Sequence, residues 1–145
     1  MRHDVFEEDF DDGTPVGKAV PCKESQDRIS AMDSTGVCIF VTSAWGMDDF
    51  AAQMDAACEG DWTSERLNEA GERIWNMERL FNLKAGLTME DDTLPARLQN
   101  EPAPTGPRKG SLAELDQMLP EYYKLRGWTK DGRPTSETLA RLSLS

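Results

Sequence analysis

Residues 63–83 read TSERLNEAGERIWNMERLFNL, the clearest helical pattern in this chain of 145 residues. The apolar side chains recur three and four positions apart, at Leu67, Ala70, Ile74, Met77 and Phe81. This spacing places them on one face of a helix. Outside that face, Glu69 and Arg73 are one turn apart and can form an ion pair. Gly86 is the expected terminator, so we expect one long helix that packs lengthwise against others.

Two shorter helical segments precede this long helix. We expect one over Lys23–Met32 and another that runs to Cys58, with Asp48 or Asp49 as its cap. The second has three apolar residues on one face: Phe50, Met54 and Ala57. Between them, Cys38–Trp45 is apolar and partly β-branched, a pattern that cannot separate a short strand from a buried helical turn. We favour the helical turn, because the segments downstream are helical.

Helix breakers divide the chain after residue 86. Three prolines and two glycines fall within Gln99–Gly110, which predicts a surface loop. Ser111 followed by Glu114 matches a capping box and predicts a new helix. That helix would carry four apolar residues in register: Leu112, Leu115, Met118 and Leu119. Pro120 either kinks it or begins the next helix.

The C-terminal residues predict a turn and a last short helix. Asp131–Pro134 has the composition of a turn, and Thr135 or Ser136 can cap a helix that carries Leu139 and Leu142. The nearby aromatic residues are interpreted as core or interface: Tyr122, Tyr123 and Trp128. No strand pair is evident. The expected fold is therefore all-α, an irregular multi-helix bundle in a single domain over 1–145, with 1–17 as an irregular acidic arm and 99–110 as a Pro/Gly-rich internal loop.

Charge and cysteine content narrow the classes of partner and compartment. The chain has 16 basic and 27 acidic residues, a formal net charge of −11, which argues against nucleic acid and anionic membranes as partners. The acid pair Asp91 and Asp92 is interpreted as solvated or capping. Three cysteines, an odd count, fit a reducing compartment. No apolar run reaches the roughly 18 residues of a membrane span, and the first residues are acidic where a signal peptide is basic. We expect a cytoplasmic protein.

Asp33 and Cys38 lie on either side of a turn expected at Gly36. From spacing alone, Cys38 can bind zinc or an iron–sulfur iron, act as a nucleophile, or be buried as a small apolar residue. A cysteine nucleophile needs a base, and the only histidine is His3. A structural zinc site needs four protein ligands, and this stretch supplies only Cys38. Asp33 has an equally plain alternative, since aspartate at a helix end commonly accepts backbone hydrogen bonds.

Four blocks of sequence, taken in order, are more specific than any one of them. They are Asp33–Cys38, Gly71–Asn82, Asp92–Arg97 and Tyr122–Trp128. In this order and approximate spacing they resemble the C-terminal part of the tungsten-containing aldehyde ferredoxin oxidoreductases, from about Gln26 onward. The first block resembles the family's DxxGLC element, with Val37 in place of leucine.

The resemblance implies a function and a set of site residues. Enzymes of that family carry a bis-pterin with tungsten or molybdenum and a 4Fe-4S cluster, oxidise an aldehyde with water to a carboxylate, and pass electrons to ferredoxin. By the motif match, Cys38 resembles the fourth cluster ligand and Asp33 the acid that hydrogen-bonds a pterin ring. The backbone of Gly36, Val37 and Ile39 would lie against the cofactor.

The family's other cofactor-binding elements are not found in these 145 residues. Its three-cysteine cluster element, its N-terminal pterin-binding domain, its second DxxGL element and its catalytic acid all precede the region that this chain resembles. We therefore expect that the chain is inactive alone and acts with the remaining domains or a separate subunit. Two alternatives stay open: a non-catalytic helical interaction module or remnant of the family, and part of the catalytic subunit of a tungsten benzoyl-CoA reductase.

Overall fold

The computed structural model describes residues 16–145, so the expected acidic arm lies almost wholly outside the described residues. The described part is helical, with two short 3-10 helices, η1 and η2. The elements in order are α1 (Ala19–Ser34), η1 (Ile39–Ser43), α2 (Met47–Ala57), α3 (Ser64–Lys84), η2 (Met89–Asp91), α4 (Ala96–Asn100), α5 (Leu115–Arg126) and α6 (Ser136–Arg141). Within 16–145 there is no strand, only an isolated bridge between Trp128 and Pro134. The all-α prediction is confirmed.

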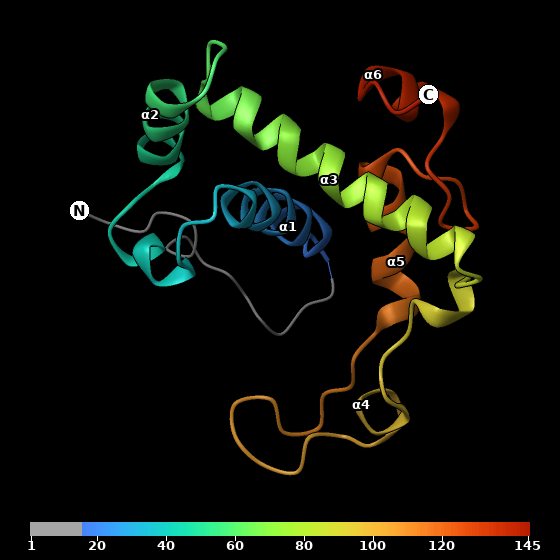
Figure 1. Cartoon of the computed structure of the whole chain (residues 1–145). Coiled ribbons are helices and arrows are strands. Elements are labelled where there is room, and N and C mark those ends of the chain that lie inside the picture. Colours follow the sequence, from blue (N-terminus) through green and yellow to red (C-terminus); the bar gives the residue numbers. More distant parts are fainter. Residues whose placement is uncertain (1–15) are drawn as a thin grey trace.

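Helix α3 is the longest element, and α1, α2, α5 and α6 lie at successive places along it, whereas α4 is farther away (Figure 1). The Thr63 hydroxyl caps its first turn by accepting a hydrogen bond from the Arg66 N–H, 3.3 Å away. After its last residue, Gly86 takes a left-handed φ of 105° that few other residues tolerate. The prediction of a helix over Thr63–Leu83 with Gly86 as terminator is therefore confirmed to within one residue at each end.

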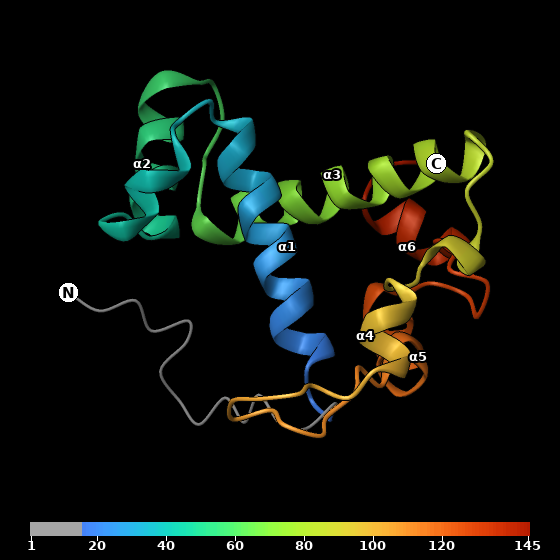
Figure 2. The same cartoon turned by 90° about the horizontal axis from the view of Figure 1, so that it is seen from below.

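Helix α1 crosses α3 at close range, as both views show (Figures 1 and 2). The crossing is centred on Gly71, whose missing Cβ would lie 1.9 Å from the backbone oxygen of Asp27 and 3.1 Å from the Cβ of Ala31. Only glycine fits at this point. Helix α1 begins at Ala19, four residues before the predicted start at Lys23, because proline is tolerated in the first helical turn and Pro21 does not block it.

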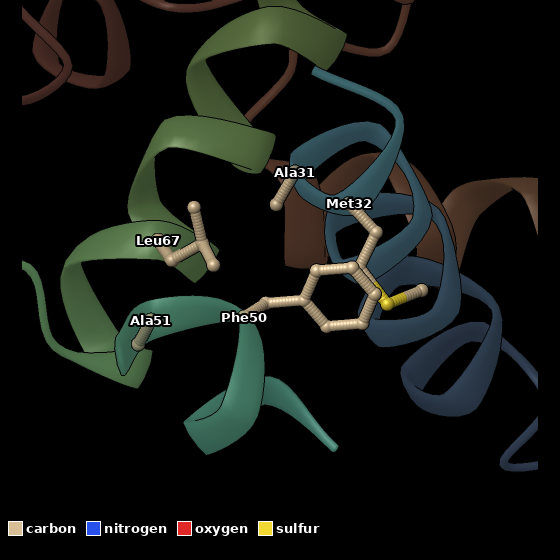
Figure 3. Packing of buried hydrophobic residues seen from close by; sticks show 5 residues of the cluster. All are labelled: Ala31, Met32, Phe50, Ala51 and Leu67. Carbon is tan, nitrogen blue, oxygen red and sulfur yellow. The ribbon is translucent and has the colours of Figure 1, made fainter. Parts of the chain in front are cut away.

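A cluster of buried apolar side chains joins α1, α2 and the first part of α3 (Figure 3). Its members are Ala31, Met32, Phe50, Ala51 and Leu67. The Phe50 ring points toward Met32 and meets the Trp45 ring edge-on at 5.5 Å. Burying a side chain of this size contributes about 1.5–3 kcal/mol. This apolar cluster packs the end of α1 that leads to Asp33 against α2 and α3.

The other half of α3 is held mainly by buried polar side chains. Asn76 accepts a hydrogen bond from the indole N–H of Trp128 at 2.8 Å, and Arg79 donates to the backbone oxygen of Gly132 at 2.7 Å. Tyr123 and Trp128 are buried beside them, which confirms the interpretation of the aromatic residues as core. The predicted turn at Asp131–Pro134 is present, because the Thr129 N–H donates to the Arg133 oxygen across it.

The predicted apolar face of α3 is wrong at its second half. Met77 and Phe81 are 53% and 71% exposed. The buried residues of the helix are instead Leu67, Gly71, Asn76 and Arg79. The inward face was set by the helix crossing and by polar partners, neither of which appears in a hydrophobic pattern.

Two predicted helix starts are also wrong. Helix α2 begins at Met47 with Gly46 at the cap position, and Asp49 instead accepts a hydrogen bond from the Gly46 N–H at 2.9 Å. Its residue Ala57, expected inside, is exposed. The Ser111–Glu114 capping box does not form. The backbone oxygen of Ser111 accepts from the Ala103 N–H, and α5 begins only at Leu115.

The remaining local predictions agree with the structure in part. The loop expected from Gln99 to Gly110 starts after α4 and extends to residue 114, and it projects away from the other helices below α4 in Figure 1. Pro120 lies inside α5. Thr135 caps α6, as predicted, by accepting from the Thr138 N–H at 3.2 Å. The helical preference for Cys38–Trp45 is confirmed as η1, although η1 has no buried residue.

Candidate functional site

The predicted site residues run from the last turn of α1, through a tight turn, to the first residue of η1. The hydroxyls of Ser34 and Thr35 donate back to the backbone oxygens of Ala31 and Met32 at 2.6 and 2.7 Å, which closes the last turn of α1. Gly36 then adopts a φ of 75°, and its N–H donates to the Asp33 oxygen at 3.2 Å. The turn therefore places Asp33 and Cys38 on the same connection, as the sequence predicts.

Cys38 carries a free thiol at the surface of the chain. Its backbone is extended, with φ −63° and ψ 134°, and its carbonyl oxygen accepts from the Val41 N–H at 3.0 Å. Ile39 and Phe40 beside it are 50% and 84% exposed. The alternative that Cys38 is simply a buried apolar residue is therefore wrong for this structure. The sulfur is accessible to a ligand or to another polypeptide.

The Asp33 side chain lies at the edge of a groove of about 560 Å³ between α1 and α3. The groove is lined by Cys22, Ser25, Gln26, Ile29, Ser30, Asp33 and Ser34 from α1 and by Ile74, Trp75 and Glu78 from α3. Asp33 is exposed, and within residues 16–145 no hydrogen bond or ion pair of its carboxylate is found. The carboxylate is therefore available to accept hydrogen bonds from outside the chain.

The groove is the part of the site that the sequence analysis missed. Gln26, Ile29, Ser30 and Asp33 follow a helical spacing on one face of α1, and this spacing was the available signal. A second pocket of about 400 Å³ shares Cys22, Gln26, Trp75 and Glu78 with it. At this shared part, burial raises the pKa of the Cys22 thiol, and the charge of Arg126 offsets this effect in part.

Cys38 has no companion metal ligands in the part of the chain that the structure describes. No group of three or more histidine, cysteine, aspartate or glutamate side chains is gathered there. The interpretation of Asp91 and Asp92 as solvated or capping is confirmed for Asp91, which caps η2, and is wrong for Asp92, which is an ion-pair partner. Asp91 accepts from the Thr88 N–H at 2.7 Å, and Asp92 pairs with Arg79. Cys38 could therefore supply one thiolate ligand to a cluster that is shared with other polypeptide. The described residues cannot form a complete metal site.

A comparison with protein families identifies the chain. Residues 2–144 match the family model described as aldehyde ferredoxin oxidoreductase, domains 2 and 3. The chain belongs to the aldehyde ferredoxin oxidoreductase family. It is 52% identical over 120 residues to the tungsten-containing aldehyde ferredoxin oxidoreductase of Pyrococcus abyssi and 51% identical over 121 residues to that of Pyrococcus furiosus. These matches cover 82% and 83% of this chain and 20% of each relative.

A solved structure shares the fold of this aldehyde ferredoxin oxidoreductase family member. It is the active site complex BamBC of benzoyl-coenzyme A reductase with 1,5-dienoyl-CoA, with a TM-score of 0.75 and 23% identity. The match covers 95% of this chain and 20% of the other. The family and the helical fold are therefore shown, over about a fifth of the length of each known protein. Within residues 16–145, every helix is too short or too polar to cross a membrane.

Proposed function

We propose that this chain is the C-terminal portion of a tungstopterin and iron–sulfur oxidoreductase that oxidises aldehydes to carboxylates. The observation that carries the proposal is the family match over residues 2–144, which spans the exposed turn from Asp33 to Cys38. The chain corresponds to a fifth of its relatives' length, so the remaining domains or a separate subunit would complete the enzyme. The relatives' names support tungsten as the metal.

In this proposal Cys38 supplies one thiolate to a 4Fe-4S cluster, whose other three ligands come from the rest of the enzyme. The free, exposed thiol supports this role, because a shared ligand must project from the surface of the chain. Docking of the remaining polypeptide would cover Ile39 and Phe40 and exclude water from the cluster. A drier environment and hydrogen bonds to sulfur are the protein's means of setting a cluster's potential.

Asp33 would accept hydrogen bonds from the amino and ring N–H groups of a pterin. A carboxylate has two oxygens and can accept two such bonds side by side, and charge makes them stronger than neutral ones. The lack of any intramolecular partner for this side chain within residues 16–145 supports the role. The backbone of Gly36, Val37 and Ile39, which follows Asp33 in the same turn, would lie against the cofactor.

The reaction consumes one aldehyde and one water and yields a carboxylate, three protons and two electrons. When bound, the tungsten pterin supplies the oxygen-transfer and two-electron chemistry. A 4Fe-4S cluster held in part by Cys38 would supply one-electron chemistry, which suits ferredoxin as the acceptor. This chain's own residues hold the cofactor and carry no step of acid–base chemistry in the proposal.

The test is to assemble the chain with the remaining polypeptide of its enzyme and to compare the unmodified complex with Cys38→Ser and Asp33→Asn. We expect tungsten and iron in the unmodified complex, together with aldehyde-dependent reduction of ferredoxin. Cys38→Ser should lose the 4Fe-4S absorption, and Asp33→Asn should lower the tungsten content. Matched controls are Cys58→Ser, a second exposed thiol, and Glu24→Gln, a second exposed acid on α1. An unmodified complex without tungsten and iron, and without aldehyde-dependent reduction of ferredoxin, would refute the proposal.

A second candidate is a non-catalytic helical interaction module that keeps the family fold. The exposed apolar side chains of Met77 and Phe81, one turn apart on α3, favour it, since exposed apolar residues that lie together mark surfaces for a partner. The same experiment separates the two functions. Tight assembly that is unchanged by Cys38→Ser, in a complex that holds no iron, supports the module.

A third candidate is part of a benzoyl-CoA reductase catalytic subunit, which the shared fold with BamBC allows. The substrate of the assembled complex distinguishes this candidate from the aldehyde-oxidising enzyme. Activity of the assembled complex on an aromatic acyl-thioester, with none on aldehydes, would favour the reductase, and aldehyde oxidation alone would exclude it.

A further inference from the structure

Arg126, at the end of α5, is fully buried with 0% of its surface exposed, and its guanidinium contacts α1. It donates to the carboxylate of Asp27, to the Gln26 side-chain oxygen at 2.6 Å and, at 3.4 Å, to the backbone oxygen of Lys23. All three acceptors belong to two consecutive turns of α1. One planar side chain therefore holds α1 through several directional bonds at once.

Tyr122 joins this contact to α3. Its hydroxyl donates to the Gln26 side-chain oxygen at 2.7 Å and accepts from the Arg126 Nε and from the Trp75 indole N–H, each at 2.9 Å. The Arg126 guanidinium also lies over the Trp75 and Tyr122 rings, at 5.2 and 5.3 Å from their centroids. Together, Gln26, Asp27, Trp75, Tyr122 and Arg126 form one network, named here the α1 clamp, in which Asp27 and Arg126 are buried and the other three are partly buried.

The α1 clamp contacts the same face of α1 from which Asp33 projects. Asp33 lies seven residues after Gln26, a rotation only about 20° short of two full turns, so both residues project from the same side of α1. Both line the groove between α1 and α3. At the same level, the Asp27 backbone oxygen rests against Gly71 of α3. Side-chain bonds from α5 and backbone contact with α3 thus fix the rotation of α1 about its own axis.

We propose that Arg126 is a positioning residue that sets the rotation of α1 and thereby the direction in which Asp33 and Cys38 are presented to the cofactor. The part of this inference that concerns the cofactor rests on the proposed function. The apolar cluster lies at the C-terminal end of α1. It tolerates sliding and rotation of the helix better than the α1 clamp does, because apolar contacts are non-directional. A buried arginine with fixed hydrogen-bond directions supplies the angular constraint that a methyl-lined contact does not.

The test uses the chain itself, labelled for nuclear magnetic resonance. Arg126→Lys keeps the charge but cannot bind Asp27 and Gln26 as a fork, and Tyr122→Phe removes only the bridging hydroxyl. We expect both to shift the backbone amide resonances of residues 33–38. The control is Leu142→Ala, which creates a cavity just after α6 and leaves every residue of the α1 clamp unchanged. Should Arg126→Lys fail to fold, Tyr122→Phe carries the comparison.

Two results would overturn the inference: unchanged resonances for residues 33–38 in Tyr122→Phe, or equal shifts in Leu142→Ala. A second readout uses the assembled enzyme, in which Arg126→Lys should retain iron but shift the cluster's electron paramagnetic resonance spectrum. An unmodified complex without iron would defeat the proposed function and leave the amide result standing. Failure of the positioning role and failure of the proposed function are therefore distinguishable.

Discussion

The guanidinium of Arg79 donates two parallel hydrogen bonds to the carboxylate of Asp92, at 2.7 and 2.5 Å. Arg79 is buried on α3, and Asp92 follows η2, so this pair ties the segment after α3 back to the helix. The Tyr123 hydroxyl donates to the same carboxylate, and the Arg79 guanidinium lies 4.9 Å from the Trp128 ring centroid. The Arg79–Asp92 pair therefore connects α3, the segment after η2 and α5 in the C-terminal half of the molecule.

Replacing Asp92 with asparagine should destabilise the chain strongly, because Arg79 would keep its buried charge without a counter-charge. Removing one partner of a fully buried pair costs about 3–5 kcal/mol, and we expect roughly 2–4 kcal/mol here because Asp92 is partly exposed. Urea denaturation followed by circular dichroism measures the change. The control is Asp116→Asn, an exposed acid in the first turn of α5, which should change stability by less than about 1 kcal/mol. Equal effects of the two variants would contradict the prediction.

Gly71→Ala should separate α1 from α3. The new methyl group would meet the backbone oxygen of Asp27 rather than a flexible side chain, so the helices themselves must move. Overpacking of this kind costs about 1–3 kcal/mol or more. Gly46→Ala is the control, since no atom lies within 4 Å of a Cβ there and φ is −94°. Comparison of the two free energies of unfolding checks the prediction, and a Gly71 variant as stable as the control would show that the crossing is not tight.

The chain's two tyrosines should not ionise before the protein unfolds. Burial raises the pKa of Tyr122, and burial together with the hydrogen bond to Asp92 raises that of Tyr123. An unfolded tyrosine titrates near pH 10. Above that pH the unfolded state releases protons that the folded state retains, so stability should fall as pH rises through about 10. Tyrosinate absorbance should therefore appear together with loss of helical circular dichroism, and its appearance in the intact fold would be the contrary result.

The three thiols should react at different rates. Cys22, Cys38 and Cys58 are all free and at the surface, but partial burial raises the pKa of Cys22 and so lowers its thiolate fraction near neutral pH. We expect Cys22 to react severalfold more slowly with a disulfide reagent than Cys38. Single serine variants assign each kinetic phase, with Cys58→Ser as the reference. A fast phase that disappears in Cys22→Ser would contradict the prediction.

Glu72 should contribute stability that is lost in acid. Burial alone raises the pKa of Glu72, but the hydrogen bond from Arg141 and the charges of Lys23 and Arg141 outweigh it, and the net shift is downward. A lowered folded pKa gives stability above the unfolded value, about 4.3, that disappears as pH falls below it. Arg141→Gln should flatten this acid limb of the stability curve. An unchanged slope would show that the ion pair is too exposed to matter, as many surface pairs are.

The long helix and the site turn could be predicted from sequence because both depend on local signals. The three-and-four spacing within 63–83 and the stop at Gly86 are properties of the helix alone. The turn at Gly36 likewise needs only a residue that tolerates positive φ. The roles proposed for Asp33 and Cys38 rest on the family resemblance, since their spacing alone left several chemistries open.

The inward face of α3 could not be predicted, because it depends on residues distant in sequence. Asn76 is buried since Trp128, 52 positions away, hydrogen-bonds it, and Arg79 is buried since Asp92 and Gly132 neutralise and satisfy it. A hydrophobic pattern scores such residues as surface and scores Phe81 as core. The failed capping box has a similar cause: the Ser111 carbonyl is used by Ala103 within the loop.

The bond between Arg126 and Asp27 joins positions 99 apart in the chain. During synthesis, Asp27 and Gln26 leave the ribosome long before Arg126 is made, so α1 cannot take its final position until α5 has been made. Contacts so distant in sequence form slowly, because closing a long segment carries a larger entropic cost than closing a short one. The turn from Asp33 to Cys38 would therefore acquire its final orientation only after α5 has been made.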